Sequence, residues 1–272
     1  MTRRRITSFS NETVKRVRSL RDKKHRRAER RFLAEGLRLL TEALDSGHVP
    51  ELLLMADKRL SHPLVDRLEQ AVAAAGGEVI ELPEDLLVKI TGKDNPQAVA
   101  GVFAELQTEL ARLDRNAAPV WLVAHAMRDP GNLGTMLRTG DAVGAGGLIL
   151  IDDCADPFSV EAVRASMGAI FTQSIAQAGW AEFLAWLRAP GDGPPGQLVA
   201  ASLRDAQPYR GAPYSNPCFV LVGNESRGLP EEYELACDLR VTMPMMGRAD
   251  SLNAAVAGAV LAYEVIASFG EG

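Results

Sequence analysis

The chain has 272 residues, of which 47% are hydrophobic and 24% are charged. This composition is typical of globular proteins and excludes a wholly disordered chain. The length corresponds to one large domain or two of ordinary size. The formal net charge is −5, which by itself excludes no class of partner.

Membrane, secretory and metal classes find little support in the sequence. The longest apolar run, residues 254–263, is ten residues long, whereas a spanning helix needs about 20. The charged N-terminus is not followed by an apolar stretch, so we expect neither a signal peptide nor a membrane partner. Cys154, Cys218 and Cys237 form no disulfide framework and no CxxC pair. We therefore expect a cytoplasmic protein without a metal ion.

Basic residues are concentrated at the N-terminus. Residues 1–38 contain 14 Lys and Arg against 4 Asp and Glu, while the remainder carries a net charge of −15. Such a segment attracts phosphates and supplies sequence-independent affinity for nucleic acid. A solvated amphipathic helix would explain the same pattern, and a thin apolar face disfavours membrane binding. We predict RNA contacts from Arg16, Arg18, Arg21, Lys23, Lys24, Arg26 and Arg27.

Residues 1–105 are predicted to form a small α/β domain. Leucines at positions 33, 37, 40 and 44 recur at helical spacing, and Gly47 is a plausible stop. A second helix is expected at 64–75. Short apolar segments predict strands at 51–55, 78–82 and 98–104. The polar segment 106–119 is predicted to be a linker.

Residues 120–272 are predicted to form a second α/β domain. Continuous apolar runs at 120–124, 148–151, 198–201 and 219–222 are typical of strands buried on both faces. Helical segments lie at about 132–143, 159–167 and 180–188. This alternation indicates a doubly wound parallel sheet. Ligands of such sheets bind beyond the carboxyl ends of the strands, so the loops there are the candidate sites.

The first such loop follows residues 120–124 and contains Asp129, Asn132, Gly134 and Arg138. Asp, Pro, Gly and Asn are turn and capping residues, so a helix is expected to begin near Asn132. Arg138 then lies about one and a half turns inside this helix. A capped helix with one surface arginine would explain this loop alone.

The second loop runs from Gly223 to Pro230, directly after the strand at 219–222. Two glycines five residues apart, Gly223 and Gly228, allow close approach of the backbone to a ligand or a positive φ. A simple turn would explain the glycines but not Glu225 between them.

The third loop contains Met243, Pro244 and Met245, followed by Ser251-Leu252-Asn253. Asp250 or Ser251 is the expected N-cap of the following helix. An apolar, conformationally restricted loop suits a flat base and a thioether. The following helix, to about residue 269, is apolar on nearly every side. Such a helix must be buried by its own sheet and by another chain, which predicts a homodimer.

Other enzyme classes lack their signatures. A dinucleotide fingerprint must follow the first strand, but the glycine-rich segment at 144–147 precedes a strand. No GxxxxGK[ST], HExxH or GxSxG sequence occurs. Nucleotide-dependent dehydrogenase, metallohydrolase and serine-hydrolase mechanisms are therefore disfavoured.

Together and in this order, the three loops resemble those of the SpoU (TrmH-type) RNA ribose methyltransferases. The Asn-x-Gly-x-x-x-Arg motif is similar to Asn132, Gly134 and Arg138, and the Gly-x-Glu-x-x-Gly-Leu motif to Gly223–Leu229. The family's third motif is an apolar-Pro-Met loop that precedes Ser-Leu-Asn and an Ala-rich helix. It resembles Met243-Pro244-Met245 and Ser251-Leu252-Asn253 here. The segment 164–169 also resembles the family. The resemblance covers about residues 120–269.

The N-terminal part resembles the L30e-like substrate-binding domain of some family members. The resemblance rests on Ser10-Asn11, on the basic run after it, on the segment 32–36 and on Pro96-Gln97. Such domains are associated with ribosomal RNA more than with tRNA. One departure is His125, where relatives often carry Asp.

The resemblance implies a SPOUT fold, in which a parallel sheet ends in a C-terminal trefoil knot. It also implies S-adenosylmethionine as the cofactor, held bent by the knot loops. The implied cofactor residues are Gly223, Asn224, Gly228, Met243, Met245 and Leu252. The family acts as a homodimer through the knot region, with Arg138 beside the cofactor of the partner chain.

The implied reaction is methyl transfer to a ribose 2′-hydroxyl of RNA, with 23S ribosomal RNA as the expected substrate. The implied catalytic set is Arg138, Asn132, Glu225, Ser251 and Asn253. We interpret Arg138 as a phosphate and alkoxide ligand, because a guanidinium resists deprotonation. The alternatives are a tRNA 2′-O-methyltransferase and a non-catalytic RNA-binding protein of the same fold.

Overall fold

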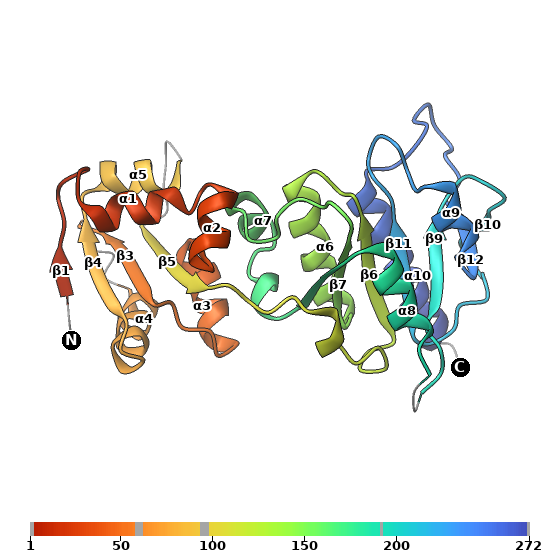
Figure 1. Ribbon diagram of the computed structural model, residues 1–272, viewed down its shortest axis with the longest axis horizontal. Helices are drawn as coiled ribbons and strands as arrows, with labels where there is room; N and C mark the ends of the chain where they lie inside the picture. The colour runs from red at the N-terminus through yellow and green to blue at the C-terminus, as the bar shows by residue number, and fades with distance from the viewer. Residues whose placement is uncertain (1–2, 58–61, 93–97, 191–192, 271–272) are drawn as a thin grey trace. The chain divides into compact units, whose positions relative to one another are not determined.

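The computed structural model describes residues 3–57, 62–92, 98–190 and 193–270. It divides the chain into two compact units, each built on its own sheet (Figure 1). Unit 1 is Met1–Leu106 with Asp156–Thr172, and unit 2 is Gln107–Ala155 with Gln173–Gly272. The boundaries differ from those predicted, because residues 156–172 were expected in the second domain. Pro96-Gln97, used in the resemblance, lies outside the described residues.

Unit 1 contains a mixed sheet in the order β1-β4-β3-β5-β2. Strands β1, β4 and β3 are parallel, and β5 is antiparallel to both of its neighbours. The strands are β1 (Arg3–Arg5), β2 (Arg31–Glu35), β3 (Leu52–Ala56), β4 (Glu78–Leu82) and β5 (Val99–Ala104). The helices are α1 (Glu12–Ser19), α2 (Lys23–Glu29), α3 (Leu37–Asp45), α4 (Pro63–Ala74), α5 (Glu84–Thr91) and α7 (Val160–Ala165), with a 3₁₀ turn at Ala169–Phe171.

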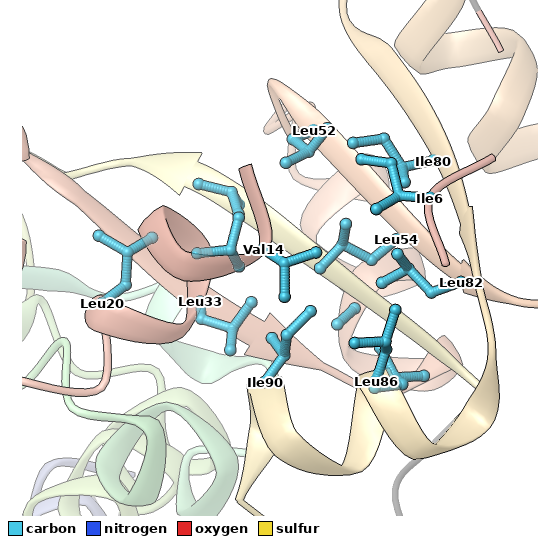
Figure 2. Close-up of a cluster of buried hydrophobic side chains, with 14 of the residues drawn as sticks. Ile6, Val14, Leu20, Leu33, Leu52, Leu54, Ile80, Leu82, Leu86 and Ile90 are labelled. Atoms are coloured by element: carbon cyan, nitrogen blue, oxygen red, sulfur yellow. The ribbon is translucent and has the colours of Figure 1, made fainter. Parts of the chain in front are cut away.

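One core cluster of unit 1 lies between its sheet and helices α1 and α5. Figure 2 shows Val14 of α1 and Ile90 of α5 directed at strand residues such as Leu54 and Ile80. Helices α3 and α4 pack against each other, and α4 packs against β3 and β4. The N-terminal segment is therefore part of a folded core and not a detached basic arm.

One predicted helix begins too early. Leu33 was assigned to a helix with Leu37, Leu40 and Leu44, but it lies in β2, and α3 begins at Leu37. Gly36, with φ of +110°, separates the two elements. A short strand that is buried along its length has no period-2 signal, so helical spacing across its end is ambiguous.

Residues 156–172 belong to unit 1 because their aromatic side chains pack there. The ring of Phe158 lies 5.1 Å from that of Phe32, and the ring of Phe171 lies 4.8 Å from that of Phe103, measured between centroids. These phenylalanines are buried. The burial of several aromatic rings stabilises the segment in unit 1, although the stretches before and after it in the sequence belong to unit 2.

Unit 2 contains a seven-stranded sheet, in which every pair of neighbouring strands is parallel. The order is β10-β12-β9-β11-β6-β7-β8. The strands are β6 (Val120–His125), β7 (Gly147–Ile151), β8 (Ser174–Ala178), β9 (Gln197–Ala201), β10 (Gln207–Pro208), β11 (Cys218–Val222) and β12 (Leu239–Thr242). The predicted α/β class with a parallel sheet is confirmed, while β8, β10 and β12 were not predicted.

Helices cover both faces of this sheet. Phe183 and Leu187 of α8 (Trp180–Arg188) share a core cluster with Trp121 and Phe219 of the strands. On the other face, α10 (Ala254–Gly270) packs against α6 (Pro130–Val143) and against β11, β6 and β9. A short helix, α9 (Glu231–Leu235), follows the second loop.

The predicted linker at 106–119 is packed against unit 2 from Gln107 onward. It contains a 3₁₀ turn, Leu110–Arg112, and Leu110 is buried in the core. Trp121 donates its indole N–H to the carbonyl of Arg115 over 3.0 Å. The segment is therefore a structural part of unit 2.

The centre of the parallel sheet positions the candidate site. Strands β6 and β11 are neighbours, with Ala124 opposite Val222. From β6 the chain builds outward to β7 and β8, whereas β9 and β12 lie on the other side of β11. This arrangement creates a switch point, at which the loops following β6 and β11 meet beyond the carboxyl ends of the strands.

Candidate functional site

The first loop leads from β6 into α6. Asp129 caps α6, because its carboxylate accepts the backbone N–H of Asn132 over 2.9 Å. The helix begins at Pro130, two residues before the predicted start. Ala126 adopts a φ of +48°, which is costly for a residue with a side chain. Its carbonyl accepts the side-chain amide of Asn224 over 2.8 Å, which links the first loop to the second.

The second loop, Gly223–Pro230, is closed by its own hydrogen bonds. Asn224 and Gly228 exchange backbone hydrogen bonds of 3.1 and 2.9 Å. The Asn224 side-chain oxygen accepts the N–H groups of Ser226 and Arg227. A Cβ on Gly223 would lie 2.5 Å from the carbonyl carbon of Gly228, so only glycine fits there. The turn presents Glu225 toward the first loop.

Three side chains join the three loops. The amide of Asn132 donates to Oε1 of Glu225 over 3.0 Å. The amide of Asn253 donates to Oδ1 of Asn132, also over 3.0 Å. Oδ1 of Asn253 then accepts the backbone N–H groups of Ala255 and Val256 at the start of α10. We refer to Glu225, Asn132 and Asn253 as the amide chain.

The direction of every hydrogen bond in the amide chain is fixed at its ends. A carboxylate only accepts, so Asn132 must turn its NH₂ group toward Glu225. The N–H groups of α10 only donate, so Asn253 must turn its oxygen toward the helix. The two asparagines then meet as donor and acceptor. Asn253 is therefore the N-cap of α10, in place of the predicted Asp250 or Ser251.

Glu225 is held in its ionised form. Burial opposes ionisation, but hydrogen bonds from Asn132 and from backbone N–H groups, including those of Arg128 and Asp129, outweigh it and lower the pKa of Glu225. A hydrogen bond to the charged form of a carboxyl group always acts in this direction. Glu225 is thus an acceptor at neutral pH and has no proton to donate.

A pocket of about 670 Å³ opens beside these loops. This volume lies within the range of small-molecule sites, which is roughly 300–1,000 Å³. All six predicted cofactor residues line it, together with Glu225 and Ser251. The six are Gly223, Asn224, Gly228, Met243, Met245 and Leu252. The lining combines apolar side chains with backbone groups of two loops, which fits a nucleoside carrying a thioether or sulfonium.

The pocket has one wall that the sequence analysis missed. Ala201, the last residue of β9, and residues 202–204 after it line the pocket. Ser202 donates its hydroxyl to Glu234 over 2.6 Å, and Arg204 pairs with Glu231 over 2.7 Å. The signal in the sequence was their position directly after a predicted strand, at the same edge of the sheet as the other loops.

Three predicted catalytic residues do not line this pocket. Asn132 and Asn253 belong to the amide chain, which reaches the lining through Glu225. Arg138 is exposed on α6, and its side chain makes no hydrogen bond or ion pair with the described parts of the chain. Within a single chain, the structure therefore does not bring Arg138 to the pocket.

A second polar cluster lies at the same edge of the sheet. Tyr233 donates its hydroxyl to Asp152 over 2.8 Å and stacks on Trp180, with ring centroids 3.9 Å apart. Burial, followed by the interaction with Asp152, raises the pKa of Tyr233 to about 12. His125, the departure from the family pattern, lies 3.4 Å from Asp152, and burial lowers its pKa against the effect of that carboxylate. His125 is therefore neutral at pH 7.

In unit 1, many of the N-terminal cations are already paired. Arg4, Arg5, Arg16 and Arg30 form ion pairs with Glu78, Asp57, Glu29 and Glu105. Of the seven predicted RNA contacts, five make no hydrogen bond or close ion pair through their side chains within the described residues. Of these, Lys23 is half-buried, and Arg18, Arg21, Lys24 and Arg27 are exposed.

Arg26 is a correction to the predicted RNA surface. The residue is 3% exposed, and its guanidinium donates to Asp156 over 2.6 Å and to the carbonyls of Leu20 and Arg21 over 2.8 Å. A buried arginine with these partners is a structural tie. It joins the turn between α1 and α2 to the segment 156–172.

Neither thiols nor metal ligands are assembled for catalysis in the described part of the chain. Burial raises the pKa of Cys154 to about 11 and that of Cys218 to about 12, so these thiols stay protonated. Residues 3–57, 62–92, 98–190 and 193–270 contain no group of three or more His, Cys, Asp or Glu that could hold a metal ion. No helix among them is long and apolar enough to cross a membrane.

Known proteins match both parts of the chain. Residues 119–263 match the model of the SpoU rRNA methylase family. Residues 11–101 match the model of the MRM3-like substrate-binding domain. The chain belongs to the SpoU rRNA methylase family, as its three loops predicted.

Relatives cover nearly the whole chain. The 23S rRNA (guanosine(2553)-2′-O)-methyltransferase RlmP of Bacillus subtilis is 33% identical, over 96% of this chain and 99% of its own. The 23S rRNA (uridine(2479)-2′-O)-methyltransferase of Streptomyces viridochromogenes is 30% identical, over 90% and 85%. The crystal structure of an AdoMet-bound rRNA methyltransferase from Sinorhizobium meliloti is 39% identical and superimposes with a TM-score of 0.89, covering 98% of each chain.

Proposed function

We propose that this protein transfers a methyl group from S-adenosylmethionine to a ribose 2′-hydroxyl of 23S ribosomal RNA. The observation that supports this most strongly is the pocket beyond β11, which all six predicted cofactor residues line and which the amide chain borders. The family membership, the two 23S-specific relatives and the relative with bound AdoMet support the same conclusion.

The residues of the pocket fit the cofactor. Gly223, Met243, Met245 and Leu252 would hold it, with backbone groups of the second and third loops facing the adenine. When bound, S-adenosylmethionine supplies an electrophilic methyl group on a sulfonium and needs no metal ion. The protein must then position a ribose oxygen in line with that methyl group, and this positioning accounts for much of the rate.

The amide chain prepares the loops for that task. Ionised Glu225 fixes the orientation of Asn132, and Asn132 fixes Asn253 at the start of α10. Because each partner is satisfied, the three loops keep one arrangement before substrate binds. Ser251, which lines the pocket with an exposed side chain, would donate to the cofactor or the ribose.

Arg138 is proposed to act in a homodimer, at the pocket of the partner chain. Arg138 is exposed on α6 and has no side-chain partner among the residues that the structure describes. Together with the exposed Val256 and Tyr263 on the neighbouring helix α10, it supports a subunit contact on these helices. There Arg138 would bind the adjacent phosphate and stabilise the forming alkoxide. A phosphate oxygen or water would take the proton of the 2′-hydroxyl.

We propose in addition that the chain contains the C-terminal trefoil knot and that the protein is cytoplasmic.

The test of the catalytic role is Arg138→Ala. Calorimetry should show unchanged binding of S-adenosylmethionine, and methyl transfer should fall by at least about 10²-fold, as for loss of an oxyanion ligand. Retained transfer would refute the role. Mixing Arg138→Ala with Gly223→Val tests whether Arg138 acts at the pocket of the partner chain. If it does, a mixed dimer has one intact site, in which one chain supplies the pocket and the other supplies Arg138. No regain of activity would place Arg138 at its own pocket.

The RNA-binding role of the N-terminal cations requires point substitutions. Deleting residues 1–38 would remove core residues such as Val14 and Leu33, and with them the fold of unit 1. Changing Arg18, Arg21, Lys24 or Arg27 to glutamine should weaken RNA binding, with the salt slope reduced by about 1 for each contact. An unchanged slope would show that these cations do not touch the RNA.

A further inference from the structure

An exposed aromatic ring stands beside the cations of unit 1. Phe9 lies between β1 and α1 with 40% of its surface accessible. Its neighbours along the chain, Ile6 and Val14, point into the core (Figure 2). Apolar surface is therefore available nearby, yet Phe9 is only partly covered. A large exposed aromatic ring is a candidate for contact with a partner.

Hydrogen bonds within residues 8–13 hold the turn that carries Phe9. The backbone N–H of Asn11 donates to the carbonyl of Ser8 over 3.2 Å, and the N–H of Ser10 donates to the hydroxyl of Ser8 over 3.2 Å. Asn11 also caps α1 by accepting the N–H of Thr13 over 2.9 Å. These hydrogen bonds hold the turn, so a partner that binds Phe9 would meet a preorganised site.

The ring already carries a cation. The ammonium of Lys89, on α5, lies 3.7 Å from the centroid of the Phe9 ring. This distance is well inside the roughly 6 Å limit of a cation–π contact. Gly92 caps the end of the same helix, and the guanidinium of Arg21 lies so close to this glycine that an added Cβ would clash with it. One flat apolar ring is thus accompanied by two positive groups from the α1 and α5 region.

The chemistry that uses a flat ring and nearby cations together is that of an unpaired nucleotide. A base that is not stacked in a helix offers its face to an aromatic ring, and its phosphate offers charge to lysine or arginine. A paired RNA duplex offers the phosphates but hides the faces of its bases. An acidic peptide would need the cations without the ring.

We propose that Phe9 and Lys89 form a stacking site for an unpaired RNA nucleotide. The inference rests on the proposed function, because it assigns the kind of RNA that unit 1 recognises. The base would stack on the ring of Phe9, and Lys89 would move from the ring to the adjacent phosphate. A substrate for this protein would then present an unpaired nucleotide in addition to the methylated one.

The test compares two RNA probes on the full-length protein. One is single-stranded oligouridine, and the other is a blunt RNA duplex with the same number of nucleotides. Phe9→Ala should weaken binding of the single strand by about 5- to 150-fold, the range for loss of one stacked base. Duplex binding and its salt dependence should stay unchanged. Phe9→Tyr keeps an aromatic face and should restore binding, while the control Lys24→Gln should weaken both probes alike.

The remaining outcomes overturn the proposal. Unchanged binding of the single strand by Phe9→Ala would remove the stacking site, and the proposed function would survive if that variant still methylates ribosomal RNA. Equal loss on both probes, or no rescue by Phe9→Tyr, would make the ring a structural element only. A wild-type protein that binds neither probe and methylates no RNA would overturn this inference and the proposed function together.

Discussion

The amide chain predicts different pH dependences of stability for two matched variants. Asn132→Asp has almost the same shape but replaces the NH₂ group, which donates to Glu225 over 3.0 Å, by a carboxylate oxygen. Two carboxylates would then face each other at hydrogen-bond distance. At neutral pH the variant loses a hydrogen bond to a charged acceptor and gains like-charge repulsion. Asn132→Ala loses the hydrogen bond without adding a charge.

The expected loss of unfolding free energy for Asn132→Asp is about 2 kcal/mol at pH 7. A hydrogen bond to a charged group contributes about 1.5–3 kcal/mol, and the exposure of Glu225 favours the lower end. Asn132→Ala should lose about 1–2 kcal/mol by the same reasoning. The free energy of unfolding, measured by urea titration at several pH values, gives both numbers.

The sign of the pH dependence separates the variants. In the wild type the pKa of Glu225 is lowered, so its contribution to stability is present above the ordinary glutamate value and is lost as pH falls through the folded-state pKa. In Asn132→Asp the facing carboxylates raise one folded-state pKa above its unfolded value. The variant should therefore recover stability, relative to the wild type, as pH falls toward about 4. Asn132→Ala introduces no second carboxyl group, so it should lack the part of this recovery that comes from the raised carboxyl pKa. A pH-independent loss in Asn132→Asp would refute the proposed direction of the amide chain.

Three further predictions concern stability. Arg26→Ala should lower the free energy of unfolding by about 3–5 kcal/mol, because it leaves Asp156 as an uncompensated, nearly buried charge. Arg27→Ala, on the exposed side of the helix, should change it by less than about 0.5 kcal/mol. Equal effects of the two substitutions in denaturant titration would contradict the burial of Arg26. Ala126→Gly should raise the free energy of unfolding by about 0.5–1 kcal/mol, because glycine adopts the φ of +48° without the steric cost that alanine meets there. A lower midpoint of unfolding in urea would contradict this prediction. Tyr233→Phe should cost about 1 kcal/mol through the lost hydrogen bond to Asp152, and an unchanged melting temperature would show that water replaces it.

The sequence predicted the elements whose signal is local. The continuous apolar runs of β6, β7, β9 and β11 were correctly assigned to a parallel sheet. The short strands β8, β10 and β12 were missed, because two to five residues of mixed polarity have no period of their own. Their pairing depends on neighbours far along the chain.

Arg26 shows why a charge pattern does not define a surface. It lies among exposed cations on α2, and nothing in the local sequence distinguishes it from Arg27. Its burial is decided by Asp156, 130 residues away in the chain. The same distant segment supplied Phe158 and Phe171 to unit 1, so one long-range docking event accounts for both departures from the prediction.

The N-cap of α10 illustrates the same limit at the site. Asp250, Ser251 and Asn253 are all good capping residues, and their order in the sequence does not choose among them. Asn253 caps the helix in the structure, and its amide is at the same time bound by Asn132, 121 residues earlier. A choice made by a tertiary hydrogen bond is invisible to local propensity.

This coupling explains why three weak motifs together were informative. Asn132, Glu225 and Asn253 each have an ordinary local explanation as a turn, loop or capping residue. Only one arrangement lets the carboxylate accept from the first asparagine, the first asparagine accept from the second, and the second accept from a helix N-terminus. Replacing any one of these residues by an apolar side chain would remove at least one hydrogen bond that links the loops. The specificity of the signal therefore lies in the donor and acceptor order of the amide chain, which spans all three loops.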